Sequence, residues 1–195
     1  MKTFLSQIEM PWALALKQGL ADPYKLHQWI WNALPDDPDA KRDFLFRSDV
    51  KGRVLRILLL SARVPAPADN TAWKTTEVSE TFLGHGTYRF QLRANPTFRR
   101  RSDRRRLAIF DEAEIRDWFA RKFADAGCEI QDLETKALQR HQFKKDGKTG
   151  TVCSVDASGI LIVHDEAAFR TAFDAGIGPA KGFGFGLLLL QPISR

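Results

Sequence analysis

The segment GIGPAKGFGFGLLLL, residues 176–190, is the strongest constraint on the architecture of this chain. Five glycines fall between positions 176 and 186, and glycine lets backbone N–H groups approach a phosphate closely. A helix is predicted before this loop and a strand after it. A dinucleotide-binding fingerprint needs the opposite order, and a Walker A loop needs a Gly-Lys-Ser/Thr sequence that this loop lacks. The loop is therefore a phosphate contact outside those two classes or a turn that leads into the last strand.

Local signals predict the elements of the C-terminal half. Asp111 and Glu114 have the spacing of a capping box and mark the start of a helix. Asp146-Gly147 is a tight-turn signal between two strand-like segments and predicts a β-hairpin with a basic tip. The elements predicted for this half are a helix over 111–127, hairpin strands over 139–143 and 151–155, a strand over 160–163, a helix over 165–176 and a strand over 187–190.

The N-terminal half follows the same α+β pattern. Asp22-Pro23 predicts a helix start, because aspartate is a good N-cap and proline fits the first helical position. Pro35 ends that helix. The elements predicted here are a strand over 4–8, a helix over 22–35, a strand over 54–62 and an alternating, half-buried strand over 88–92.

Composition and charge favour a folded protein with a polyanionic partner. Hydrophobic residues make up 44% of the chain, which predicts a packed core and excludes disorder. The net charge is +6, a field that attracts RNA, DNA or an anionic surface. Six arginines lie within the eight residues 99–106. We expect this run to be a basic linker, 98–106, between an N-terminal domain, 1–97, and a C-terminal domain, 107–195.

Cysteines and apolar runs indicate the compartment. Cys128 and Cys153 lack the clustering of a disulfide scaffold or a zinc site. Residues 1–20 contain no apolar stretch of the signal-peptide type. The longest apolar run, 186–190, is far shorter than the ~20 residues that span a bilayer. We expect a cytoplasmic protein with no membrane partner.

One face of the first predicted helix carries a candidate site. Tyr24, His27 and Trp31 are spaced by three and four residues and therefore share a face, offset from the apolar stripe of Leu26 and Ile30. His27 is predicted to point out of the core. It lies near the helix N-terminus, where the dipole favours a phosphate.

Four segments, in the same order along the chain, resemble motifs of the CRISPR-associated Cas6 endoribonucleases, and most closely the Cas6e branch of type I-E systems. They are the Tyr-x-x-His helix start at 24–28, the segment Arg42-Asp43-Phe44-Leu45-Phe46, the segment Leu92-Arg93-Ala94-Asn95-Pro96, and the terminal glycine-rich motif from Gly176 to Leu188. Together they reach from the first predicted helix to the last strand.

This resemblance implies an α+β fold of two tandem ferredoxin-like (RRM-like) domains. It implies cleavage of precursor CRISPR RNA beside the repeat stem-loop, with the enzyme staying on the 3′ hairpin of the crRNA. It also implies a place in the type I-E Cascade complex of antiviral defence. His27 would be the general acid or base and Tyr24 an orienting or proton-sharing partner. No second catalytic acid or base is identified, and Lys181 and Lys145 are candidates.

The chemistry of RNA explains why a histidine suits this role. The ribose 2′-OH lies next to the scissile phosphorus, so the substrate carries its own nucleophile, and we expect no metal and no cofactor. Imidazole suits the proton transfers because its unperturbed pKa is ~6.5. The expected products are a 2′,3′-cyclic phosphate and a 5′-OH.

Basic side chains are expected to hold the RNA mainly by the shape and phosphate positions of its stem, because A-form RNA hides its base edges in a deep groove. Affinity should fall steeply with salt as counterions are released. The expected RNA-binding residues are Arg93, Arg99, Arg100, Arg101, Arg104, Arg105, Arg106, Lys144, Lys145, Lys148, Gly178, Lys181 and Gly182.

Other functions and other residues remain open at this point. One alternative is a non-cleaving RNA-hairpin-binding subunit of a ribonucleoprotein, and another is a generic RRM-like binder. The segment 181–185 has RNP-like aromatics, but it precedes the last strand instead of lying on a central one. His85, His141 and His164 are expected to be structural or solvated, with His141 the best further candidate for RNA contact. The tryptophans Trp12, Trp29 and Trp73 are expected to pack in a core or interface.

Overall fold

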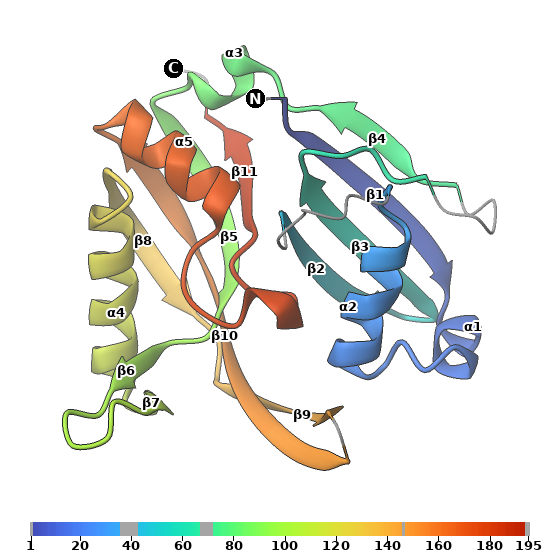
Figure 1. Ribbon diagram of the computed structural model, residues 1–195. Helices are drawn as coiled ribbons and strands as arrows, with labels where there is room; N and C mark the ends of the chain where they lie inside the picture. The colour runs from blue at the N-terminus through green and yellow to red at the C-terminus, as the bar shows by residue number, and fades with distance from the viewer. Residues whose placement is uncertain (1, 36–42, 67–71, 146, 194–195) are drawn as a thin grey trace.

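The computed structural model describes residues 2–35, 43–66, 72–145 and 147–193 (Figure 1). The N-terminal elements are β1 (Phe4–Pro11), α1 (Trp12–Lys17), α2 (Pro23–Asn32), β2 (Phe44–Lys51), β3 (Val54–Ser61), β4 (Lys74–Glu77) and α3 (Glu80–Leu83). The C-terminal elements are β5 (Thr87–Ala94), β6 (Thr97–Arg99), β7 (Arg106–Ala108), α4 (Glu112–Ala124), β8 (Cys128–Thr135), β9 (Gln139–Lys145), β10 (Lys148–Val163), α5 (Glu166–Ala175), the 3-10 helix η1 (Lys181–Phe183) and β11 (Leu188–Pro192).

The first sheet has the strand order β2-β3-β1-β4, and every neighbouring pair is antiparallel. This is the order of a ferredoxin-like domain, in which the helix after the first strand carries the chain across the sheet. Helix α2 buries Leu26 and Ile30 against Phe46 and Ile57 of the sheet, in one apolar cluster. The expected packing of Trp12, Trp29 and Trp73 against this cluster is confirmed.

The second sheet repeats this order with β11-β5-β10-β8, again antiparallel throughout. Helices α4 and α5 cover one face of the sheet (Figure 1). Phe119 and Phe123 of α4 and Phe169 and Phe173 of α5 are buried in its core. The two sheets confirm the expected α+β fold of tandem ferredoxin-like domains.

The strand over 88–92 belongs to the second sheet, which corrects the expected N-terminal domain of residues 1–97. In β5, Phe90 lies opposite Gly159 of β10, and Leu92 lies opposite Leu188 of β11. The alternation of apolar residues predicts a strand but not its partners, which here lie far along the chain. We propose that the first domain ends in the segment between β4 and β5.

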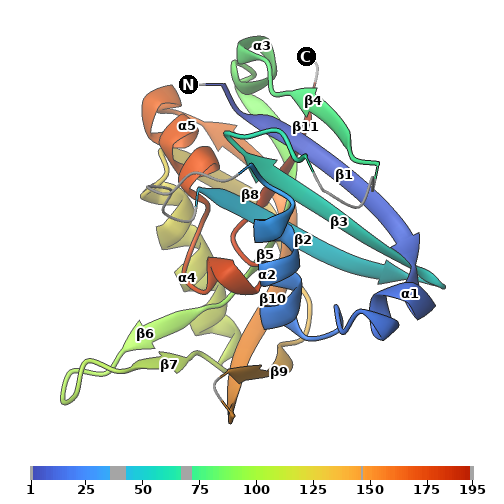
Figure 2. The same ribbon diagram turned by 45° about the vertical axis from the view of Figure 1, so that its right-hand side comes forward.

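The arginine run is also not a linker. Residues 97–99 and 106–108 pair as the two-stranded β6–β7 hairpin, with Arg99 opposite Arg106, and this hairpin stands between β5 and α4 within the second domain. The β9–β10 hairpin and the β6–β7 hairpin both project at the lower end of the molecule in two views, and the glycine-rich loop lies above them, beside α2 (Figures 1 and 2).

The two sheets are joined through buried side chains. Leu45 of β2 and Leu60 of β3 are buried within the apolar cluster of the second domain. Gly176, at the end of α5, has no room for a side chain, because an added Cβ would lie 2.6 Å from Cδ2 of Leu45. Helix α2 contacts both η1 and β9. Elements of the second domain therefore contact α2, the helix that carries Tyr24 and His27.

Candidate active site

Helix α2 presents the candidate residues because its start is fixed. The Asp22 carboxylate accepts hydrogen bonds from the backbone N–H groups of Tyr24 (2.7 Å) and Lys25 (3.3 Å), and Pro23 occupies the first turn. Leu26 and Ile30 are turned into the core, whereas Tyr24 and His27 are only half-buried, and His27 flanks the core face of the helix.

His27 is half-buried on one side of an open hollow. Its ring stacks on Phe44 of β2, with centroids 5.2 Å apart and planes inclined by 25°, and lies 6.3 Å from the ring of Trp31. The hollow has a volume of about 480 Å³ and is lined by Tyr24, His27, Gln28, Trp31 and Asn32. His27 is thus partly accessible from the surface, although its Nδ1 atom is buried, and Phe44 restricts the orientation of the ring.

The glycine-rich loop packs against the β9–β10 hairpin, and both contact α2. Phe183 of η1 and Phe143 of β9 have ring centroids 4.5 Å apart, and Phe185 lies 5.7 Å from the ring of His141. Lys181 Nζ donates a hydrogen bond of 2.5 Å to the carbonyl of Ala175. These contacts hold the loop and the hairpin as one surface next to α2.

Packing accounts for Gly178 in the loop. Its φ is 83°, in the left-handed region, and an added Cβ would lie 2.8 Å from Cη2 of Trp118. Gly182 lies within η1 and is half-buried. The turn expected from the sequence is therefore present, and a phosphate contact by Gly178, Lys181 or Gly182 stays a prediction.

Arg93 lies in an ion-pair network between the two sheets. Its guanidinium donates to Asp156 of β10 (2.7 Å), to Asp49 of β2 (2.9 Å) and to the carbonyl of Ser48 (3.0 Å). Burial alone would lower the pKa of Arg93, but the hydrogen bonds and charges of Asp156 and Asp49 outweigh it and raise that pKa. The structure thus gives Arg93 carboxylate partners, and we propose that it joins the domains instead of contacting RNA.

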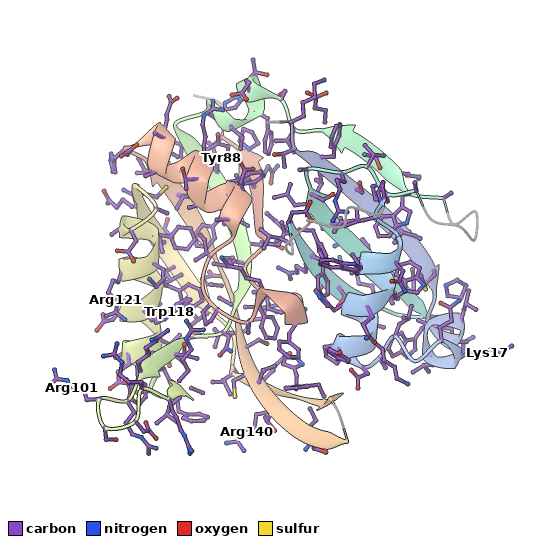
Figure 3. The ribbon with its side chains drawn as sticks, in the orientation of Figure 1. Lys17, Tyr88, Arg101, Trp118, Arg121 and Arg140 are labelled. Atoms are coloured by element: carbon purple, nitrogen blue, oxygen red, sulfur yellow. The ribbon has the colours of Figure 1, made fainter. Side chains whose placement is uncertain are left out.

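The arginines of the β6–β7 hairpin are exposed, and Figure 3 shows Arg101 projecting from its turn. Arg100 and Arg105 both form ion pairs with Asp103. Within the part of the chain that the structure describes, no carboxylate lies within 4.0 Å of Arg99, Arg101, Arg104 or Arg106. A hollow of about 440 Å³, lined by both hairpin strands, Trp118, Lys122, Gly178 and Pro179, adjoins them.

The expected lysine cluster lies on the β9–β10 hairpin. Lys145 pairs with Lys148, and Lys144 with Thr149, where the two strands project from the sheet (Figure 1). Asp146 and the side chains of these three lysines lie outside the described part of the structure. The backbone alone places them at the end of a hairpin whose strand β9 contacts α2.

The other histidines differ in their surroundings. His85 and His164 are exposed, and His164 Nε2 lies 3.3 Å from a carboxylate oxygen of Glu129. His141 Nε2 lies 2.7 Å from Oγ of the buried Ser154, and burial, with a further contribution from Arg93, lowers the pKa of His141. Neither partner could be found from the sequence, because the pairing of β10 with β8 decides the contact of His164 and its pairing with β9 decides that of His141.

Cys128 and Cys153 are free and buried, and burial together with the charge of Asp165 raises the pKa of Cys128 to about 11. Over the described ranges, no group of three or more His, Cys, Asp or Glu side chains is arranged to hold a metal ion. None of the helices there has the length and apolar character that crossing a membrane requires.

The fold and the site together define a class: basic proteins of two tandem ferredoxin-like domains, with an accessible histidine beside a glycine-rich loop and a basic hairpin. The chain belongs to the CRISPR-associated protein family, whose model matches residues 3–192. This match, with the relatives below, confirms the resemblance to Cas6e that the four motifs indicated.

Comparison with known proteins places the chain near two curated relatives. It is 36% identical over 187 residues to the CRISPR system Cascade subunit CasE of Escherichia coli K12, covering 88% of this chain and 93% of the relative. It is 27% identical over 206 residues to the CRISPR-associated endoribonuclease Cse3 of Thermus thermophilus, covering 93% of this chain and 96% of the relative. A solved structure of CRISPR endoribonuclease Cse3 bound to a 19-nucleotide RNA shares the fold, with a TM-score of 0.86, 24% identity and coverage of 98% and 100%.

Proposed function

We propose that this chain is an endoribonuclease that cleaves precursor CRISPR RNA beside the repeat stem-loop, needs no metal, and stays bound to the 3′ hairpin as a Cascade subunit. The observation that carries this proposal is His27 in its open hollow on α2, with η1 and β9 packed alongside. The names of the two curated relatives, a Cascade subunit and an endoribonuclease, support it.

In the proposed reaction, the ribose 2′-oxygen forms a bond to the adjacent phosphorus and the bond from phosphorus to the 5′-oxygen breaks. One proton leaves the 2′-OH and one is delivered to the departing 5′-oxygen, which gives a 2′,3′-cyclic phosphate and a 5′-OH. His27 accepts or donates one of these protons, because imidazole exists in both forms near neutral pH. Tyr24, one helical turn earlier, orients the reacting phosphate or the ring.

The stacking of His27 on Phe44 supports this role physically. In-line attack requires the catalytic group to be held in place before the reaction, since orientation contributes a large part of the rate. A histidine ring that moves freely in solvent loses conformational entropy each time it is oriented for the reaction. Stacking on Phe44 restricts the ring beforehand and so reduces this loss.

Substitution of His27 by alanine tests the proposal. The substrate is the CRISPR repeat RNA from the same genome, incubated with excess EDTA, and the product ends are analysed. We expect the wild type to cleave under EDTA, and the His27→Ala variant to lose at least about a hundredfold in rate while binding the RNA normally. The matched control is His164→Ala, which removes an exposed imidazole from the second domain.

The outcomes separate the candidate functions. Undiminished cleavage by His27→Ala would remove this residue from the mechanism. A wild type that binds the repeat hairpin without cutting it, with or without divalent metal, would make the chain a non-cleaving hairpin-binding subunit.

A further inference from the structure

The turn that joins β6 to β7 is organised around a single carboxylate. Asp103 is the only acidic residue between positions 97 and 108. Its carboxylate accepts the backbone N–H of Arg105 at 3.1 Å and Nε of Arg100 at 3.0 Å, and lies 3.4 Å from Nε of Arg105. One side chain therefore fastens both ends of the turn.

Backbone hydrogen bonds show the shape that results. The N–H of Arg100 donates to the carbonyl of Arg105 (2.9 Å), and the N–H of Arg104 donates to the carbonyl of Arg100 (3.0 Å). Arg104 takes a φ of 61°, a conformation that glycine and asparagine adopt more readily. Other contacts in the turn must hold Arg104 in this conformation, and the contacts of Asp103 with Arg100 and Arg105 lie on either side of it.

The carboxylate also divides the arginines into two kinds. Arg100 and Arg105 are committed to Asp103, so their charges are partly neutralised. The other four, Arg99, Arg101, Arg104 and Arg106, have no carboxylate within 4.0 Å among the described residues. The hairpin thus presents four uncompensated guanidinium groups on a scaffold that two paired arginines help to fix.

By charge alone, Asp103 is unfavourable on a surface that binds phosphates. Its negative charge lowers the local potential and repels RNA at long range. Its contribution must therefore come from geometry. A turn that already has its bound shape loses less conformational freedom when a ligand docks.

We propose that Asp103 is a positioning residue that determines specificity: it holds the β6–β7 turn so that the four uncompensated arginines match the phosphates of an RNA stem. This rests on the proposed function only in that the ligand is the RNA hairpin. Because an unstructured RNA can adapt its phosphates to any turn shape, preorganisation favours the rigid stem over the flexible strand.

The test compares two probes, the repeat hairpin RNA and an oligouridine of the same length, for wild type and Asp103→Ala. We expect Asp103→Ala to bind the hairpin about tenfold more weakly, the loss that one or two charge-assisted contacts represent. It should bind oligouridine as tightly as the wild type or more tightly, because a negative charge is gone. Asp103→Asn keeps an oxygen that accepts the N–H of Arg105, and we expect its preference for the hairpin to lie between the two.

The control for charge is Asp125→Ala, which removes an exposed carboxylate that pairs with Lys122 on α4 and leaves the turn intact. It should change binding of the two RNAs by the same small factor. Tighter binding of both RNAs by Asp103→Ala, or an unchanged ratio, would overturn the inference and leave the cleavage proposal intact. A wild type that does not prefer the hairpin to oligouridine would instead count against the proposed function itself.

Discussion

Arg104 shows how a single backbone angle bears on function. It is one of three non-glycine residues with a positive φ in the described structure, and it stands where glycine would be unstrained. The left-handed conformation costs an L-residue roughly 1–2 kcal/mol. An arginine in this position is therefore better explained by what its guanidinium binds than by the stability of the turn.

Replacing Arg104 by glycine separates these two contributions. Strain relief should be largely offset by the greater freedom of glycine in the unfolded chain, so we expect an unchanged melting temperature. Affinity for the repeat hairpin should fall, and the slope of log affinity against log salt should become shallower by about 0.7–0.9, the value of one lost phosphate contact. The control is Arg121→Ala, an exposed arginine on α4 that Figure 3 shows away from the hairpin turn. A salt slope equal to that of the wild type would mean that Arg104 touches no phosphate.

The candidate site was predictable from the sequence only where helical spacing decides the geometry. The three- and four-residue intervals placed Tyr24, His27 and Trp31 on one face, and the hollow lined by all three agrees with that prediction. Phe44, which stacks on His27, comes from a strand of the first sheet. No local signal pairs a helix face with a particular strand residue, so this contact required the structure.

At the scale of elements, the starts of the three longest helices were predictable and strand partners were not. Asp22, Asp111 and Asp165 each accept backbone N–H groups as N-caps, in agreement with the sequence. A cap depends on residues within one turn, whereas the register of a strand depends on another strand far along the chain. For this reason the sequence predicts β5 in the first domain and a linker at the arginine run, whereas β5 lies in the second sheet and the arginine run joins the paired strands β6 and β7.

The β9–β10 hairpin depends on a glycine for its contact with the glycine-rich loop. Gly150 lies opposite Phe143, and an added Cβ would lie 2.3 Å from Cζ of that ring. The same ring packs on Phe183 of η1. Any side chain at position 150 must therefore displace the ring that links the hairpin to the loop.

We expect Gly150→Ala to destabilise the protein by about 1–3 kcal/mol, as overpacking of a fitted contact does. Because the hairpin would also lose its fixed position beside α2, cleavage of the repeat RNA should slow more than stability alone explains. Denaturant unfolding and single-turnover cleavage at a temperature well below the melting point measure the two effects. Gly86→Ala is the control, since nothing lies within 4 Å of an added Cβ there. If Gly150→Ala and Gly86→Ala had equal stability and equal cleavage rates, the packing of Phe143 on Phe183 would have no role in positioning the hairpin.

At the scale of the whole molecule, the two domains are joined by charges as well as by apolar packing. Asp49 of β2 lies 2.9 Å from both Arg47 Nε and Arg93 Nη2, and Arg93 reaches Asp156 of β10. Burial alone would raise the pKa of Asp49, but the hydrogen bonds and charges of Arg47 and Arg93 outweigh it and lower that pKa. The network therefore requires an ionised Asp49 to hold one sheet against the other.

The pH dependence of stability follows from that shift. A carboxyl group whose pKa is lower in the folded than in the unfolded state binds fewer protons when folded, so its stabilisation is complete above the unfolded pKa, ~3.9. The stabilisation is lost as the pH falls from there through the lower folded pKa. Asp49→Asn removes this contribution at all pH values, so the difference in stability between wild type and variant should shrink in acid.

At neutral pH we expect Asp49→Asn to cost about 2–3 kcal/mol, less than the ~3–5 kcal/mol of a broken buried pair, because Asp156 still neutralises Arg93. The matched control, Asp43→Asn, breaks the more exposed pair with Arg63 and should cost no more than about 1 kcal/mol. Urea unfolding at neutral and acidic pH measures both. Since the network positions β2 against β10, and β2 carries Phe44 beneath His27, the Asp49 variant should also cleave more slowly while binding the hairpin normally. The contrary result is an Asp49→Asn variant that cleaves at the full rate and whose difference in stability from the wild type stays the same in acid. It would show that apolar packing alone sets the arrangement of the two sheets.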